Sequence, residues 1–287
     1  MSSYLMTSNS ISLEDSSSFT DTGAIFFELA SEQRLSILFK LSNQSSKLAQ
    51  LAKDLDVTMQ QVHRNVNRLQ DSGLIRKDAN GQFSLTTFGT TILQQIPTMN
   101  FLSRNKDYFS DHYLGDIPMK FVHRIGALDN SEYLEGLVAV LERWKQIYNS
   151  SREYIFGMLP QIPLELIESL LAKIKQSGIK FNYILSQQTI VPKKRADLLK
   201  DAGFHDLLKQ GLVERRMVDK MPVAVILNEK EATVMFPTLK KGQAVADMNS
   251  LFYSGKENVL FHEWCLDYFR YCWYSSKTFD ESKLLEV

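Results

Sequence analysis

The stretch from Ser46 to Leu85 constrains the fold of this chain more than any other part of the sequence. Leucine and alanine recur at helical spacing over residues 47–55, and a second helical pattern covers residues 59–72. A turn at Asp56-Val57 separates the two patterns, so the helices must meet closely. Two short apolar runs follow at once on either side of Asn80-Gly81, which is a strong β-hairpin signal. This order of elements predicts a winged helix-turn-helix.

The second helix of this unit carries the side chains that suggest DNA recognition. Thr58 is its expected N-cap and Gly73 its end. The apolar residues spaced to pack inward are Met59, Val62, Val66 and Leu69. The remaining side chains are rich in amides and arginine, which pair with base edges, whereas a solvated helix face usually carries Glu and Lys. The predicted DNA contacts on this helix are Thr58, Gln60, Gln61, His63, Arg64, Asn65, Asn67 and Arg68.

The N-terminal half of such a helix lies deepest in the major groove, which favours Thr58, Gln60, Gln61 and Arg64 over Arg68 for base or phosphate contacts. A polar face that meets only solvent is the alternative interpretation of the same pattern.

The hairpin after this helix adds two cations to the predicted surface. Arg76 and Lys77 lie on its first strand, where they are placed to meet phosphates or a minor groove. Its turn is expected at residues 78–81, with both Asn80 and Gly81 tolerating positive φ. A closing helix is predicted over residues 86–96, ending before Pro97.

The distribution of charge supports this location. The whole chain has 33 basic and 33 acidic residues, which by itself argues against a broad nucleic-acid-coating surface. The first 30 residues, however, have four acids and no Lys or Arg, whereas residues 31–96 have eight basic and five acidic residues. The positive excess therefore coincides with the predicted DNA-binding unit.

The composition of the rest of the chain sets the expected domain boundaries. Residues 1–22 are rich in Ser and Thr and lack periodicity, so we expect a disordered leader. We expect the winged helix-turn-helix over residues 23–97, a helical linker over 98–130 and an α/β domain over 131–287. In that last domain, apolar runs alternate with helical patterns, which predicts a mainly parallel sheet that acquires an antiparallel hairpin near residues 223–236. The predicted fold class is thus α/β with more than one domain.

Several motifs resemble those of archaeal winged-helix transcriptional regulators. The first is L-x-x-x-L-x-V-T-x-x-x-V-x-R-x-V-x-x-L-x-x-x-G-L-I followed by F-S-L-T-T-F-G. In the second half, HYLGDIP at 112–118, FGMLPQIPLELIESLLAKIKQSGIKFNYIL at 156–185, MPVAVILNEKEATVMFP at 221–237 and HEWCLDYFRYCW at 262–273 resemble the effector domain of TrmB-like regulators, and more closely their methanogenesis-regulator (FilR-like) relatives. The resemblance covers about 260 residues with loose, apolar motifs. It implies a DNA-binding regulator whose C-terminal domain resembles a degenerate phospholipase D-like fold.

The sequence lacks the catalytic motifs of several familiar enzyme classes. A phospholipase D-like reaction needs His-x-Lys, and none of the five histidines begins that motif. The sequence also lacks a Gly-x-Ser-x-Gly elbow, a phosphate-binding Gly-x-x-x-x-Gly-Lys loop and a His-Glu-x-x-His pair. We therefore expect no catalytic residues and no cofactor.

The two cysteines bear on both metals and location. Cys265 and Cys272 lie seven residues apart in one helical pattern and cannot bridge without unwinding it. His262 stands near them, but zinc normally takes three or four close ligands, so buried thiols are the preferred interpretation and no metal is expected. Reduced thiols and the absence of a membrane-spanning apolar stretch predict a cytoplasmic protein without a membrane partner.

The expected function is that of a homodimeric, sequence-specific transcriptional regulator on a palindromic operator in double-stranded DNA. A small-molecule effector would bind at the carboxyl ends of the parallel strands. These positions are Gly157, Met158, Ser186, Gln187 and Gln188. The alternatives are a phosphodiesterase- or hydrolase-like enzyme with a helical recruitment domain, and a winged-helix protein-interaction module.

Overall fold

The computed structural model describes residues 18–159, 163–187, 189–221, 223–238, 250–254 and 259–286. The chain divides into two compact units, Met1–Ile96 and Pro97–Val287, which are treated separately below. Of the predicted site residues, Gln188 lies outside the described residues, as does most of the predicted leader.

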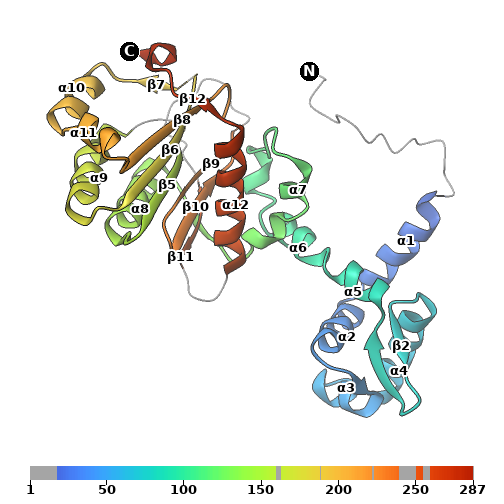
Figure 1. Cartoon of the computed structure of the whole chain (residues 1–287). Helices are drawn as coiled ribbons and strands as arrows, with labels where there is room; N and C mark the ends of the chain where they lie inside the picture. The colour runs from blue at the N-terminus through green and yellow to red at the C-terminus, as the bar shows by residue number, and fades with distance from the viewer. Residues whose placement is uncertain are drawn as a thin grey trace. The chain divides into compact units, whose positions relative to one another are not determined.

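Helices dominate the N-terminal unit (Figure 1). Its elements are α1 (Ser18–Leu29), α2 (Glu32–Asn43), β1 (Ser46–Lys47), α3 (Leu48–Asp54), α4 (Met59–Asp71), β2 (Ile75–Lys77), β3 (Gln82–Leu85) and α5 (Thr87–Leu93). The strands form an antiparallel sheet in the order β1-β3-β2. The predicted sequence of helix, turn, helix and hairpin corresponds to α3, α4 and β2–β3. Helix α1 begins at Ser18, so residues 18–22 are helical and not part of an unstructured leader.

A single apolar core joins these helices to the sheet. Leu38, Leu51, Val66 and Leu69 are fully buried in it. Met59, which the helical pattern placed inward, is instead 47% exposed. It is the first residue of α4, where the chain has just left the turn and the core side of the helix is not yet covered.

The second unit is built around a large mixed sheet. Its helices are α6 (Ile96–Arg104), which starts at the unit boundary, α7 (Met119–Val122), α8 (Leu137–Ser150), α9 (Leu164–Ser177), α10 (Lys194–Asp201), α11 (Phe204–Lys209) and α12 (Val259–Ser275), with short 3-10 turns at Tyr108–Ser110, Ile125–Leu128 and Glu281–Lys283. Its strands are β4 (Glu132–Leu134), β5 (Tyr154–Leu159), β6 (Lys180–Ser186), β7 (Ile190–Val191), β8 (Val213–Val218), β9 (Ala224–Leu227), β10 (Glu231–Met235), β11 (Ser250–Ser254), β12 (Lys277–Thr278) and β13 (Leu285–Glu286).

Within the described residues the large sheet has eight strands in the order β12-β8-β6-β5-β9-β10-β11-β4. Only the pairs β5–β6 and β6–β8 are parallel. The prediction of a mainly parallel sheet is therefore wrong, because the hairpin β9–β10 joins β5 antiparallel and β11, β4 and β12 extend the sheet in the same manner.

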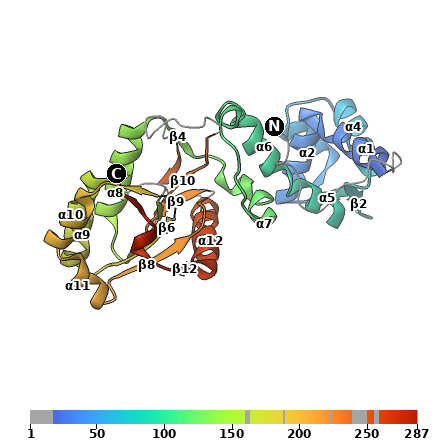
Figure 2. The same ribbon diagram turned by 90° about the horizontal axis from the view of Figure 1, so that it is seen from above.

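Helices cover both faces of this sheet. In β6, Phe181, Tyr183 and Leu185 point to one side, where α8 and α9 pack, while Ile184 points to the side of α12. Figures 1 and 2 show α8 and α9 on one face and α12 on the other. The alternation along each strand produces two apolar cores, one for each face.

The segment 98–130, expected as a helical linker, contributes to the core on the α12 side. Phe101, Phe121 and Leu128 are fully buried there. The Phe121 ring meets Trp264 edge-on, and the Trp264 indole N–H donates to the Phe121 carbonyl oxygen at 3.1 Å. The segment belongs to the second unit because its aromatic side chains bury against α12.

Candidate nucleic-acid interface

The start of α4 is fixed by a reciprocal cap. The Gln61 backbone N–H donates to the Thr58 hydroxyl oxygen at 3.3 Å, while Gln61 Oε1 accepts from the Thr58 backbone N–H at 3.0 Å and from the Thr58 hydroxyl at 2.9 Å. Two backbone donors that a helix start leaves open are thereby satisfied. Thr58 and Gln61, both predicted to contact DNA, therefore also hold the first turn of α4 in place.

The exposed face of α4 is polar and carries part of the predicted set. Gln60, His63, Arg64 and Asn67 are exposed. They recur every three or four residues, which aligns them along one side of the helix. An Asn67 Nδ2–His63 Nδ1 contact of 3.4 Å links two of them, and Arg64 has no ion-pair partner among the described residues. This face offers amide, imidazole and guanidinium groups together.

Asn65 and Arg68, two of the predicted DNA contacts on α4, do not lie on its exposed face. Asn65 is 5% exposed, and its Nδ2 donates to Gln33 Oε1 of α2 at 3.0 Å, so it does not belong to an outer surface. Arg68 binds the Glu28 carboxylate of α1 through Nε at 3.1 Å and Nη2 at 2.5 Å. As a DNA contact Asn65 stays a prediction, and its burial under α2 argues against that role. Arg68 is committed to an internal pair.

The Glu28–Arg68 pair also involves α2. Arg34 Nε lies 3.0 Å from Glu28 Oε2 and donates to the Glu28 carbonyl oxygen at 2.7 Å. The hydrogen bonds from Arg68 and the charge of Arg34 hold the pKa of Glu28 below its ordinary value, against the opposing effect of burial. No local sequence pattern predicts this pair, since its partners are 40 residues apart.

The hairpin presents its two cations to solvent. Arg76 and Lys77 are both exposed. Arg76 Nε donates to Ser84 Oγ across the strands at 3.4 Å, and Lys77 Nζ lies 5.5 Å from the centre of the Phe83 ring. These contacts orient the two stems along the hairpin and leave no carboxylate against either charge among the described residues.

The hairpin turn differs in detail from the expected one. Gly81 has a φ of 77°, but Asn80 does not have a positive φ. The Asp78 carboxylate accepts from the backbone N–H groups of Asn80 at 2.9 Å and Gln82 at 2.8 Å. The turn is therefore capped by Asp78 and has a single left-handed residue. An Asp two residues before Asn-Gly is a sequence pattern from which this turn could have been predicted.

Most of the residues predicted to bind an effector are enclosed or already bonded. Gly157 and Met158 lie buried in β5 between β6 and β9. Ser186 Oγ donates to the Asp219 carbonyl oxygen at 3.4 Å, and Gln187 Nε2 donates to Asp219 Oδ1 at 3.0 Å. Gly157 and Met158 do not lie at the open end of their strand, because β5 continues to Leu159 and both residues are paired with β6 and β9.

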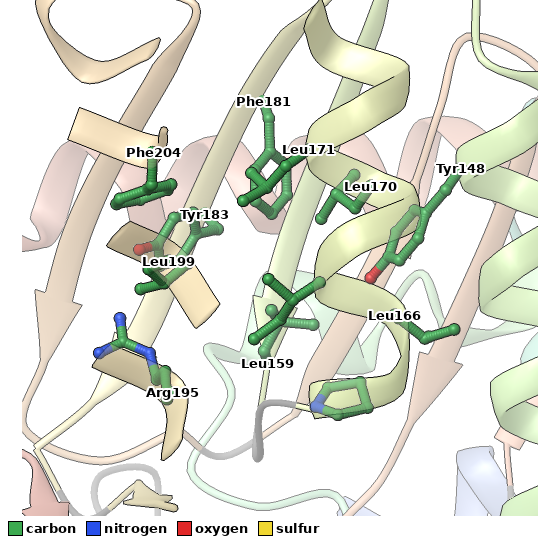
Figure 3. Close-up of a pocket in the computed structure, with 12 residues that line it drawn as sticks. Tyr148, Leu159, Leu166, Leu170, Leu171, Phe181, Tyr183, Arg195, Leu199 and Phe204 are labelled. Carbon is green, nitrogen blue, oxygen red and sulfur yellow. The ribbon is translucent and has the colours of Figure 1, made fainter. Parts of the chain in front are cut away.

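A small apolar cavity lies on the opposite side of the sheet from α12 (Figure 3). Its volume is about 50 Å³. Its lining includes Tyr148, Leu159, Leu170, Phe181, Tyr183, Arg195 and Phe204. Among the described lining residues the charged one is Arg195, which is paired with Glu281 Oε1 at 2.6 Å. Drug-sized ligands occupy pockets of roughly 300–1,000 Å³, so this cavity is too small for a metabolite.

A larger groove of about 480 Å³ lies beside α12 and opens to solvent. Its lining residues are Lys120, Phe121, Arg124, Asp267, Arg270, Tyr271, Tyr274 and Ser275. Arg124 is paired with Asp267 at 2.9 Å, while Lys120 Nζ lies 4.4 Å from the centre of the Tyr271 ring. The remaining cations give the groove a positive balance. None of the predicted ligand residues lines it.

Neither a candidate metal cluster nor a membrane-spanning helix is found in the part of the chain that the structure describes. No group of three or more His, Cys, Asp or Glu there could hold a metal ion. His262 Nε2 instead lies 2.6 Å from the Asn228 carbonyl oxygen, and both cysteines are buried. No described helix combines the length and apolar character needed to cross a bilayer.

Solved structures to which the chain is similar include TrmBL2, an archaeal chromatin protein, with 12% identity over 91% of this chain and 100% of that chain and a TM-score of 0.40. Nuc of Salmonella typhimurium, a phospholipase D family member, has 10% identity over 53% of this chain and 100% of its own, with a TM-score of 0.37. The dimethyltransferase RosA of Streptomyces davawensis has 12% identity over 71% and 65%, with a TM-score of 0.26.

Sequence comparison gives one result for the N-terminal part. No curated protein matches the chain. Residues 22–105 match the family model described as the HVO_A0261 N-terminal domain.

Proposed function

We propose that this chain is a sequence-specific DNA-binding transcriptional regulator that reads the major groove with α4 and holds the phosphate backbone with the hairpin β2–β3. In this proposal the N-terminal unit is a winged helix-turn-helix. The observation that carries it is the exposed face of Gln60, His63, Arg64 and Asn67 on α4, followed by exposed Arg76 and Lys77 on the hairpin. Amides and guanidinium groups match base edges, and hairpin cations match phosphates.

The structure revises the members of this proposed surface. Asn65 leaves it, and Arg68 becomes a positioning residue through Glu28. Thr58 and Gln61 keep a place at the first turn of α4, where the backbone is closest to a groove. The base-reading set is then Gln60, Gln61, His63, Arg64 and Asn67, with Thr58, Arg76 and Lys77 on the backbone.

We further propose a homodimer on a palindromic operator, because one reading helix covers only a few base pairs. The family resemblance of the motifs supports a TrmB-like, FilR-like archaeal regulator whose C-terminal α/β unit is phospholipase D-like in fold, without enzymatic activity. An effector, if one acts, is proposed to be a small anion in the groove beside α12, since Lys120 and Arg270 line it with the face of Tyr271.

Selection of genomic fragments by the purified full-length protein tests the function. We expect enrichment of an inverted repeat, with affinity that falls as salt rises, because the protein displaces counterions from several phosphates. Enrichment without a common motif would contradict sequence-specific reading, and no enrichment at all would favour the protein-interaction alternative. Turnover of phosphodiester substrates by the same preparation would favour the hydrolase alternative.

The effector proposal has its own measurement. Small anions are screened by thermal shift against the wild-type chain and the Arg270→Ala variant. A stabilising anion whose effect disappears in the variant would support the groove, whereas equal stabilisation of both would place the site elsewhere.

A further inference from the structure

Helix α1 has one face that packs on its own unit. Leu29 is buried in the N-terminal core, Ile25 packs partly against it, and Glu28 binds Arg34 and Arg68. These three residues occupy neighbouring angles around the helix, since successive residues turn by about 100°. The inward face of α1 is therefore settled.

The opposite face of α1 is apolar and exposed. It consists of Phe19, Gly23, Phe26 and Phe27, here called the α1 stripe. The three phenylalanines are 43%, 50% and 62% exposed, respectively. Figure 1 shows α1 projecting from the other helices of its unit. Adjacent exposed aromatic side chains of this kind mark interaction surfaces more often than ordinary solvated faces.

The α1 stripe carries no acid and is symmetrical about its glycine. The guanidinium carbons of Arg34 and Arg68 lie 5.9 and 5.0 Å from the centre of its Phe27 ring. Asp21 and Glu28, the acids of α1, lie on the side away from the stripe. Phe19 and Phe27 each stand four residues from Gly23. A Cβ built on Gly23 would have no atom within 4 Å, so the space above the middle of the stripe is open.

We propose that the α1 stripe binds the α1 stripe of a second copy of this chain, antiparallel across a two-fold axis that passes near Gly23. In that arrangement Phe19 of each copy lies against Phe27 of the other, and the two Gly23 backbones approach closely. A two-fold interface requires a surface that complements itself, and the spacing Phe-x-x-x-Gly-x-x-x-Phe does so. The two guanidinium groups beside Phe27 are both paired with Glu28, which favours an apolar partner surface over a charged one.

The area of the α1 stripe indicates under which conditions two copies pair. Three half-exposed phenylalanines of roughly 200 Å² each bury on the order of 300 Å² per copy. A stable dimer of free chains buries about 800 Å² per partner. The stripe therefore joins copies that are already close together, as on the inverted repeat of the proposed function, on which this inference rests.

Pairing through α1 would also orient the reading helices. The Glu28–Arg68 hydrogen bonds tie α1 to α4, and the Arg68 guanidinium carbon lies 5.0 Å from the centre of the Phe27 ring. A fixed angle between two α1 helices therefore fixes the angle between two α4 helices. The contact between the two α1 helices would therefore determine the spacing of the two DNA half-sites.

Disulfide trapping in the full-length chain tests the contact. The G23C variant is oxidised with copper phenanthroline, with and without the inverted-repeat DNA, and run on a non-reducing gel. We expect a linked dimer that forms at least tenfold faster with DNA, because a disulfide requires Cα atoms within about 7 Å of each other. The matched control is D21C on the other side of α1. The native cysteines should not form disulfides in this experiment, since burial raises the pKa of Cys272 to about 11 and that of Cys265 well above its usual range.

Linkage of D21C as fast as G23C, or no linkage of a folded G23C variant, would overturn the pairing. A second measurement uses F26S and, as its control, F39S, whose phenylalanine on α2 is 45% exposed. We expect F26S to lose about tenfold in affinity for two half-sites and nothing for one half-site, with F39S unchanged on both. Equal losses in the two variants would overturn the pairing. Absence of any DNA binding by the wild-type chain would instead contradict the proposed function.

Discussion

The guanidinium group of Arg68 donates to both carboxylate oxygens of Glu28, which joins the helix proposed to read DNA to the first helix of the chain. A bidentate pair holds its partners in one relative orientation better than a single hydrogen bond. Arg34 closes the same carboxylate from α2, so three helices share one anion. The orientation of α4 therefore depends on a residue outside the helix-turn-helix.

Replacing Glu28 with Gln is expected to destabilise the N-terminal unit in a pH-dependent manner. The pKa of Glu28 is lowered in the folded chain, so its contribution is complete above its ordinary value of 4.5 and is lost as pH falls through the lowered value. We expect a loss of about 0.5–1 kcal/mol at neutral pH, a few degrees in melting temperature. Thermal melts of both proteins between pH 3 and pH 7 should converge in acid. Glu32→Gln, an exposed acid on α2, should show no such convergence.

Removing either of two cations of the proposed interface should change DNA binding in a different way. Arg64→Ala is expected to cost about 1–3 kcal/mol and to relax preference at one base position, whereas Lys77→Ala should weaken all sequences alike and reduce the salt slope by about 1. Binding isotherms on the selected repeat and on scrambled DNA, at several salt concentrations, separate the two effects. If both variants bind like the wild type, the assigned surface is wrong.

Asn65→Ala should affect folding and not base preference. The substitution removes the hydrogen bond to Gln33 and leaves the partly buried Gln33 amide oxygen without its donor, at a cost of about 1 kcal/mol. Denaturant unfolding measures the loss, and DNA selection with the folded variant should return the wild-type motif. An altered motif would show that Asn65 reaches the DNA after all.

Gly89→Ala should be among the most damaging substitutions in the N-terminal unit. A Cβ at this position would lie 1.9 Å from the Leu74 carbonyl oxygen, so α5 and the start of β2 would have to separate. We expect a loss of about 2–4 kcal/mol, measured by denaturant unfolding. Gly23→Ala is the control, because it meets nothing and should raise helix stability by up to about 1 kcal/mol. A mild effect at Gly89 would mean that α5 can move freely.

Local signals in the sequence predicted the local structure well. The Thr58 cap, the end of α4 near Gly73 and the hairpin turn at residues 78–81 all depend on residues within one or two turns of each other. The position of Arg64 on the exposed face follows from helical periodicity alone. These are short-range consequences of side-chain and backbone chemistry.

Long-range contacts account for the errors. Nothing near Asn65 in the sequence indicates that Gln33, 32 residues away, covers it. The direction of the outer strands likewise depends on pairing between distant segments, such as β11 with β4 and β12 with β8. The effector residues depend on a rule for parallel strand ends, but Gly157 and Met158 lie within β5, which continues to Leu159, and are buried there.

The cap at the start of α4 limits what Gln61 can report about a base. A glutamine that recognises adenine through two hydrogen bonds must accept with Oε1 and donate with Nε2. In this protein Oε1 already accepts from the backbone N–H and the hydroxyl of Thr58, so only the amino group can face outward. Guanine and adenine both offer N7 to such a donor. The operator position opposite Gln61 should therefore accept either purine, and the information content of the site should reside in the positions next to it.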